Sequence, residues 1–225
     1  AAAKFTHVRG SILGSEADQN RAFSGPDHPN LGYFDELDRR FLSVHKRRLV
    51  TDVVLASNPD ALSKLFPDWQ SRKRFVRFAV ARYGALNITW QGLEEFEGHA
   101  NGRPLLKEIG LALKALDPYQ HPRSSNAKVT SSPLLSDGWM DFIIDHSGND
   151  QIGSVEHQLY QVPFVGITTT QHLWNATMNG QYPVIEGGFR KEPQFWFNIV
   201  SAPRHWELEP YFSPGAAAPS PRQDT

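Results

Sequence analysis

Strand-like and helix-like runs alternate along this chain, and this alternation constrains its fold most strongly. Strand candidates, short and mostly rich in β-branched residues, cover 5–13, 49–56, 87–93, 127–132, 141–145 and 183–187. Between most of them apolar residues recur at helical spacing, which predicts helices over 33–44, 72–83, 105–116 and 151–161. Alternating strands and helices form a parallel sheet covered by helices. The sequence therefore predicts an α/β fold.

Carboxylates gather where two of the predicted strands end. Strand 87–93 is followed by Glu94, Glu95 and Glu97, and strand 183–187 contains Glu186. Parallel α/β barrels carry their active sites at the C-terminal ends of the strands, and crowded ionisable groups point to chemistry more than to packing. Two carboxylates flanking one bond are what a glycosidase requires. These positions predict a TIM-barrel-like (β/α) sheet with catalytic carboxylates.

The number of strands leaves the barrel incomplete. A closed barrel of this type needs eight strands, whereas the pattern supplies fewer. The chain is then either a piece of a longer barrel or an open, truncated one, with a partner chain or missing residues completing it. We expect one barrel domain over residues 1–212 and a disordered tail rich in Pro, Ala and Ser over 213–225.

Composition excludes several classes of protein. A formal net charge of −1 argues against a dedicated nucleic-acid binder, and the basic residues of 72–83 are interpreted as the solvated face of an outer helix. No apolar run is long enough to span a membrane. The chain has no cysteine, which removes disulfides and thiolate chemistry. No signal-peptide pattern is visible.

Motifs for metals and cofactors are absent from the sequence. There is no His-Glu-x-x-His, no calcium loop of standard spacing, no Gly-x-Gly-x-x-Gly and no phosphate loop. Asp145, His146, Asn149 and Asp150 form the one local polar cluster of note. The sequence therefore predicts neither a cofactor nor a catalytic metal.

Four stretches resemble a known family of enzymes. They are 32–40, 49–55, 82–90 and 141–148. They are similar to the second helix, the third strand, the approach to the fourth strand and the sixth strand of the apiosidase-like glycoside hydrolases, which fold as (β/α)8 barrels. The resemblance runs from about residue 5 to about residue 200, and it lacks the family's first strand and helix and its last strand. It implies a secreted or periplasmic enzyme that hydrolyses a plant or microbial polysaccharide.

The resemblance also implies roles for the two carboxylates. Glu95, five positions after Trp90, matches the acid/base of the family. The position of the nucleophile is Gly188, so Glu186, two residues earlier on the same face of the strand, is the best remaining candidate. Together they imply a retaining mechanism. On a regular strand Glu94 and Glu95 point to opposite faces, so only one reaches the interior.

Other polar and aromatic residues are candidates for contact with substrate. His146 either hydrogen-bonds a sugar hydroxyl or caps a loop, and one Trp near a loop could stack on a sugar ring. The expected substrate-binding residues are Gln91, Glu94, Asp145, His146 and Trp206. The alternative function is a non-catalytic, degenerate barrel that binds glycan or serves as an accessory subunit, since the expected nucleophile position is Gly188.

Overall fold

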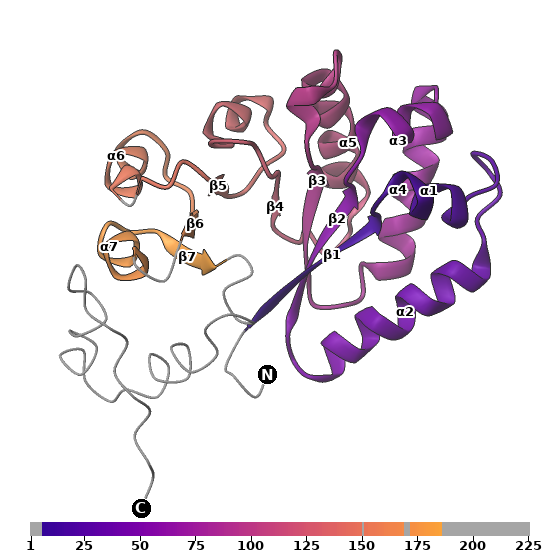
Figure 1. Cartoon of the computed structure of the whole chain (residues 1–225), viewed down its shortest axis with the longest axis horizontal. Coiled ribbons are helices and arrows are strands. Elements are labelled where there is room, and N and C mark those ends of the chain that lie inside the picture. The colour runs from indigo at the N-terminus through magenta and orange to yellow at the C-terminus, as the bar shows by residue number, and fades with distance from the viewer. Residues whose placement is uncertain (1–5, 150, 169–171, 186–225) are drawn as a thin grey trace, which may run out of the picture. The chain divides into compact units, whose positions relative to one another are not determined.

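The computed structural model describes residues 6–149, 151–168 and 172–185, in two compact units (Figure 1). One unit is Thr6–Asp145, and the described residues from His146 onward belong to the other. The range 1–212, expected to form one domain, stays a prediction because residues 186–225 lie outside the described part.

The unit Thr6–Asp145 is a parallel sheet with helices between its strands. The four strands β1 to β4 lie in the order β1-β2-β3-β4, and each pairs in parallel with the next. The helices α1 to α5 connect them (Figure 1). In chain order the elements are β1 His7–Leu13, α1 Glu16–Ala22, α2 Leu31–Lys46, β2 Val50–Ala56, α3 Pro59–Leu65, α4 Trp69–Tyr83, β3 Ile88–Leu93, α5 Gly102–Leu116, β4 Arg123–Ser124 and β5 Ile143–Asp145, with short 3-10 helices at Phe96–Gly98 and Ser132–Asp137.

Side-chain caps explain where several of these helices begin. Asn30, Asn58 and Asp68 precede α2, α3 and α4, and each accepts a hydrogen bond from a backbone N–H of the first turn. Such caps satisfy donors that the helix itself leaves unpaired. Of these three helices, α3 begins three residues after β2, so its cap fixes where the chain turns at the C-terminal end of that strand.

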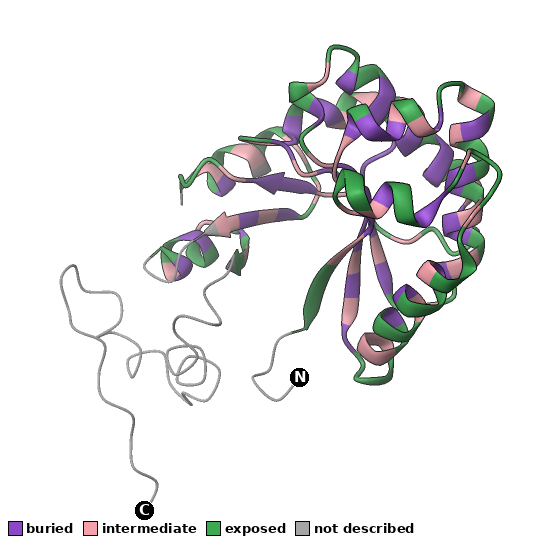
Figure 2. Cartoon of the chain, turned by 45° about the vertical axis from the view of Figure 1, so that its right-hand side comes forward, coloured by how far each residue is buried: buried purple, intermediate pink, exposed green. Residues whose placement is uncertain are grey.

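One face of the sheet packs against the helices. Gly10 of β1 lies against Phe41 of α2, and Gly92 of β3 lies against Leu106 of α5, because an added Cβ would come within 3.1 Å and 2.4 Å of those side chains. Trp90 is fully buried on the same face. The buried residues follow the sheet and the inner sides of the helices (Figure 2). Alternation along each strand then directs the intervening residues to the opposite face.

Three of the basic residues of α4 pair with carboxylates on neighbouring segments. Arg82 binds Asp38 of α2 at 2.7 Å. Arg72 pairs with Glu108 of α5, and Arg74 lies 2.6 Å from Asp27. The basic face of α4, predicted to be solvated, is therefore partly occupied by ion pairs with neighbouring segments. Arg72 has only 14% of its side chain exposed, so it is not available to nucleic acid.

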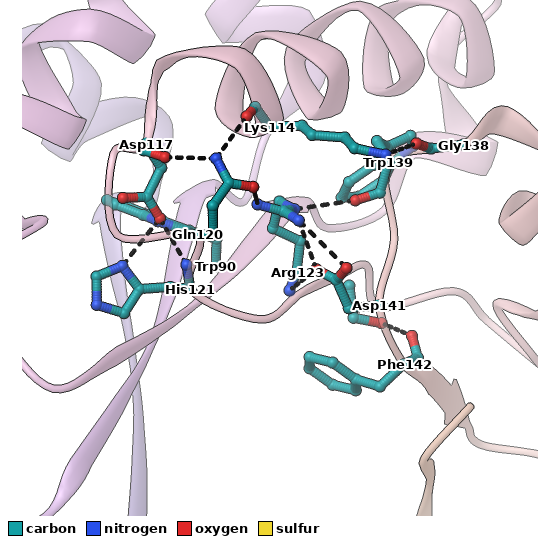
Figure 3. A network of polar contacts seen from close by, with 11 residues as sticks. Trp90, Lys114, Asp117, Gln120, His121, Arg123, Gly138, Trp139, Asp141 and Phe142 are labelled. Carbon is teal, nitrogen blue, oxygen red and sulfur yellow. Dashed lines mark hydrogen bonds and ion pairs between the residues drawn. The ribbon is translucent and has the colours of Figure 1, made fainter.

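A polar network closes the N-terminal end of the sheet. Asp117, directly after α5, accepts hydrogen bonds from Trp90 Nε1 and from the backbone N–H and ring of His121 (Figure 3). Arg123 is buried and pairs with Asp141 at 3.0 Å. At this end of a (β/α) barrel such residues serve stability, and function lies at the other end.

The second unit repeats the strand–helix–strand pattern. It contains α6 Ile152–Leu159, β6 Phe164–Thr168, α7 Leu173–Met178 and β7 Tyr182–Ile185. The strands β6 and β7 are parallel, with Val165 opposite Tyr182. Gly166 leaves room for Gln181, whose Oε1 would lie 1.8 Å from an added Cβ. No helix in the described ranges is long and apolar enough to cross a membrane.

Most of the predicted strands are confirmed, with shifts of a few residues at their ends. The strand over 127–132 is wrong, because the Lys128 N–H donates to Glu97 Oε1 and Thr130 forms only an isolated bridge with Asp145. The strand of this region is β4, at Arg123–Ser124. The predictions missed α1, α3, β6 and α7. The tail at 213–225 lies outside the described residues.

Candidate active site

A row of polar side chains crosses the face of the sheet opposite the helices. Arg9, Asp52 and Thr89 are register partners on β1, β2 and β3. Asp52 accepts from Arg9 Nε at 3.0 Å, from Thr89 Oγ1 at 2.6 Å and from Gln91 Nε2 at 2.9 Å. These three hydrogen bonds hold the carboxylate in one orientation. If this face of the sheet served only for packing, apolar residues would be expected on it.

Glu94 extends this row to the C-terminal end of the sheet. Its Oε2 accepts a hydrogen bond from Ser57 Oγ at 2.7 Å, and its Oε1 lies 3.9 Å from Arg9 Nη1. Ser57 Oγ is also 2.9 Å from Ser11 Oγ. With 22% of its side chain exposed, Glu94 is fixed by protein contacts and still reachable from solvent.

Glu95 is placed quite differently. The strand β3 ends at Leu93, and Glu95 has a left-handed backbone with φ of 52°. Its side chain is exposed and forms no hydrogen bond or ion pair with another described residue. A left-handed non-glycine residue is strained and is often found at functional sites. Because both carboxylates lie beyond the strand, strict alternation of faces does not apply to them.

Among the described residues, two other non-glycine residues have the same left-handed backbone, and they lie at different places in the fold. Arg48 and Gln120 lie in the turns that lead from a helix into a strand, at the N-terminal side of the sheet. Glu95, in contrast, lies in a turn that leads from a strand into a helix. It is the one left-handed non-glycine residue of the described ranges in such a turn. That is the side on which α/β barrels carry out their chemistry.

Gln91 lies beneath the two carboxylates with an unsatisfied acceptor. It is 1% exposed, and its Oε1 finds no partner in the described part of the chain. Buried polar atoms are rarely left unpaired, so such an acceptor suits a ligand hydroxyl or an ordered water. That Gln91 contacts substrate stays a prediction, and this acceptor is compatible with it.

The remaining candidates divide between described and undescribed positions. Asp145 is buried at the end of β5, and His146 is partly exposed and begins the second unit. Glu186, Gly188 and Trp206 lie outside the described residues. The described residues contain no group of three or more potential metal ligands.

Sequence reasoning missed several residues that build this site. Arg9, Asp52, Thr89 and Ser57 were not among the predicted site residues, yet they orient Glu94 and Gln91. A signal was present, since Asp52 interrupts an apolar strand and Thr89 stands two residues before Gln91. Polar residues spaced by two on neighbouring parallel strands share a face and can form one network.

A parallel sheet with helices between its strands is the architecture of a (β/α) barrel, and this chain has the fold of part of such a barrel. No model of a known protein family matches the chain, and no curated protein matches it. Solved structures do match. A glycoside hydrolase family 5 protein from Bacteroides vulgatus has a TM-score of 0.62 at 15% identity, over 82% of this chain and 52% of its own.

Two further structures agree on the fold. A second protein from Bacteroides vulgatus has a TM-score of 0.65 at 14% identity, over 86% of this chain and 48% of its own. A protein described as a glycoside hydrolase has a TM-score of 0.62 at 12% identity, over 82% and 54%. The chain thus spans about half the length of these structures. Together with the parallel sheets, they show a partial TIM-barrel-like α/β fold.

Proposed function

We propose that this chain is part of a glycoside hydrolase that cleaves a plant or microbial polysaccharide by a retaining mechanism. The observation that carries the proposal is the pair Glu94 and Glu95 at the C-terminal end of β3. Glu94 is held by Ser57 and Arg9, and Glu95 is exposed on a strained backbone. Two structural neighbours described as glycoside hydrolases support the assignment.

The roles follow from the accessibility of each group. An exposed carboxyl can give a proton to the departing glycosidic oxygen and later take one from water, so Glu95 is assigned as the acid/base. The fixed carboxylate of Glu94 accepts a hydrogen bond from a substrate hydroxyl. Gln91 Oε1 supplies a second acceptor below it.

The second carboxylate is assigned to Glu186. It would attack the anomeric carbon as Glu95 protonates the leaving oxygen, giving a glycosyl ester of Glu186. Water, deprotonated by Glu95, then attacks the same carbon and releases the sugar with its original anomeric configuration. Asp145, His146 and Trp206 are proposed to contact substrate. An apiosidase-like specificity is proposed from the sequence resemblance alone.

The proposed substrate bears on where the protein works. Polysaccharides do not cross membranes unaided, so we propose a secreted or periplasmic location. Completion of the barrel by a partner chain, or by residues beyond this chain, is proposed as well, because the chain spans about half of its structural neighbours.

Release of reducing sugar from a panel of plant and microbial polysaccharides tests the proposal. We expect activity on at least one member and a loss of 100-fold or more in Glu95→Gln, in line with general acid–base catalysis at about 10²–10⁴-fold. Glu16→Gln is the matched control, because Glu16 is exposed and its nearest ion pair is 4.0 Å long. Unchanged hydrolysis in Glu95→Gln would contradict the assignment, and glycan binding without cleavage would favour a non-catalytic barrel.

A further inference from the structure

A pocket of about 400 Å³ opens in the loops that follow Glu95. It lies between the turn after β3, the first turn of α5 and the segment after β4. All three follow the C-terminal ends of strands, where open α/β sheets bind ligands. The residues that matter here are Phe96, Glu97, His99, Ala100, Arg103 and Leu134.

His99 lines this pocket and has one ring nitrogen already paired. Its Nδ1 pairs with Asp60, in the first turn of α3, and 17% of the side chain is exposed. A carboxylate at Nδ1 fixes the ring orientation and favours the tautomer that leaves Nε2 as an acceptor. The nitrogen left for a ligand is therefore Nε2.

Two charged side chains of the pocket are also anchored. Glu97 Oε1 accepts from the Lys128 N–H at 2.7 Å. Arg103 donates to the Pro133 carbonyl at 3.1 Å and lies 3.4 Å from Asp137. Asp137 is shared with Lys107, which lies 3.3 Å from it, and Glu97 adds a second carboxylate. Because two carboxylates face two cations, the pocket and its edge offer no excess positive charge to an anion. It offers fixed donors and acceptors to an uncharged ligand, at a reduced entropic cost of binding.

Two of the residues that line the pocket are apolar and almost fully buried. Phe96 and Leu134 are 5% and 4% exposed. Gly102 allows α5 to start directly against the turn after β3, since an added Cβ would lie 1.7 Å from the Phe96 carbonyl oxygen. A sugar ring has C–H faces that pack on such apolar side chains and hydroxyls at its rim that suit the polar groups of the pocket.

We propose that this pocket is a subsite that binds one uncharged sugar unit of the polysaccharide, beyond the unit that is cleaved. Its volume lies at the lower end of the range for ligand sites, roughly 300–1,000 Å³. The proposal rests on the glycoside hydrolase function proposed above. It adds a substrate class, neutral chains, and makes His99 a specificity-determining residue.

The test measures binding of neutral hexasaccharides by calorimetry to the Glu95→Gln protein, so that cleavage does not intervene. The probes are cello-, xylo-, manno- and galactohexaose. Ala100→Trp fills the pocket from an exposed position, and Ala115→Trp is the matched control at an exposed position of α5 outside it. His99→Ala removes the acceptor. Thermal unfolding of each variant verifies that it is folded.

We expect at least one hexasaccharide to bind, with Kd raised about tenfold or more by Ala100→Trp, about fivefold by His99→Ala and not at all by Ala115→Trp. Equal binding by Ala100→Trp, or no binding of any probe, would overturn the subsite. Hydrolysis by the chain without the Glu95 substitution is measured separately. If Glu95 proves dispensable for cleavage while Ala100→Trp abolishes binding, the catalytic assignment fails and the subsite stands.

Discussion

Replacement of Asp117 by Asn tests the network at the N-terminal end of the sheet. The side chain of Asp117 is fully buried, and its Oδ2 accepts from Trp90 Nε1 at 3.1 Å and twice from His121 at 2.9 Å. Its Oδ1 accepts from the Tyr119 N–H at 3.0 Å. Asn keeps the shape but has one acceptor, so its amide would face the Tyr119 N–H as a second donor.

The magnitude follows from these contacts. A buried hydrogen bond to a charged group contributes about 1.5–3 kcal/mol, and bonds to a neutral acceptor are roughly half as strong as bonds to a carboxylate. One bond is lost and three are weakened, so Asp117→Asn should lower the free energy of unfolding by about 3 kcal/mol. Asp27→Asn is the control, because the Asp27–Arg74 pair is exposed and such pairs contribute about 0–1 kcal/mol.

The pH dependence has a definite sign. Burial raises the pKa of Asp117, but hydrogen bonds from His121, Tyr119 and Trp90 outweigh it and lower the pKa below its usual value. A lowered pKa in the folded state stabilises the fold above the unfolded-state pKa, roughly 4. That stability is lost as the pH falls through the folded-state pKa.

Urea unfolding at pH 7 and at a series of pH values below 5 measures both effects. The protein with Asp117 should lose stability over this acid range, and Asp117→Asn should lose less, since it has no carboxyl to protonate there. A cost below 1 kcal/mol at pH 7, or the same acid sensitivity in both proteins, would refute the reasoning.

Two more predictions concern packing and the active site. Gly110→Ala should destabilise the protein by about 2 kcal/mol in thermal unfolding, because its Cβ would lie 2.1 Å from Trp139; Gly98→Ala, with nothing within 4 Å of its Cβ, should change little. A stable Gly110→Ala protein would contradict the packing of α5. Ser57→Ala releases Glu94 Oε2 and should lower kcat/KM about fivefold with little loss of stability. Unchanged kinetics would show that Ser57 does not position Glu94.

The fold was predictable where periodicity is strong and local. Runs of β-branched residues predicted strands 49–56 and 87–93. Apolar residues at helical spacing predicted helices α2, α4 and α5. The short helices α1 and α3 were missed, since loop-like residues surround them and their caps, Ser15 and Asn58, act through contacts that a periodicity test does not see. The strand over 127–132 failed for a long-range reason, the bond from Lys128 to Glu97.

The site was predictable only in part. The carboxylates after β3 stand out in the sequence, and the structure places both at the C-terminal end of the sheet. Glu94 is bound by Ser57 and Arg9, whereas Glu95 is exposed to solvent. Ser57 and Arg9 are distant from Glu94 in the sequence, and the register of β1 to β3 brings them near it. Glycine usually marks a left-handed turn in a sequence, but the turn at Glu95 has none. The assumption that the side chains of Glu94 and Glu95 alternate between the two faces of the strand was therefore wrong.

The distance between the carboxyl groups of Glu95 and Glu186 in a crystal structure tests the central claim most directly. The account predicts about 5–5.5 Å across an open cleft, the separation of a retaining glycosidase. A separation of about 6.5–9.5 Å would indicate an inverting enzyme instead. Carboxyl groups much further apart, or a Glu186 buried in an ion pair, would contradict the two-carboxylate mechanism.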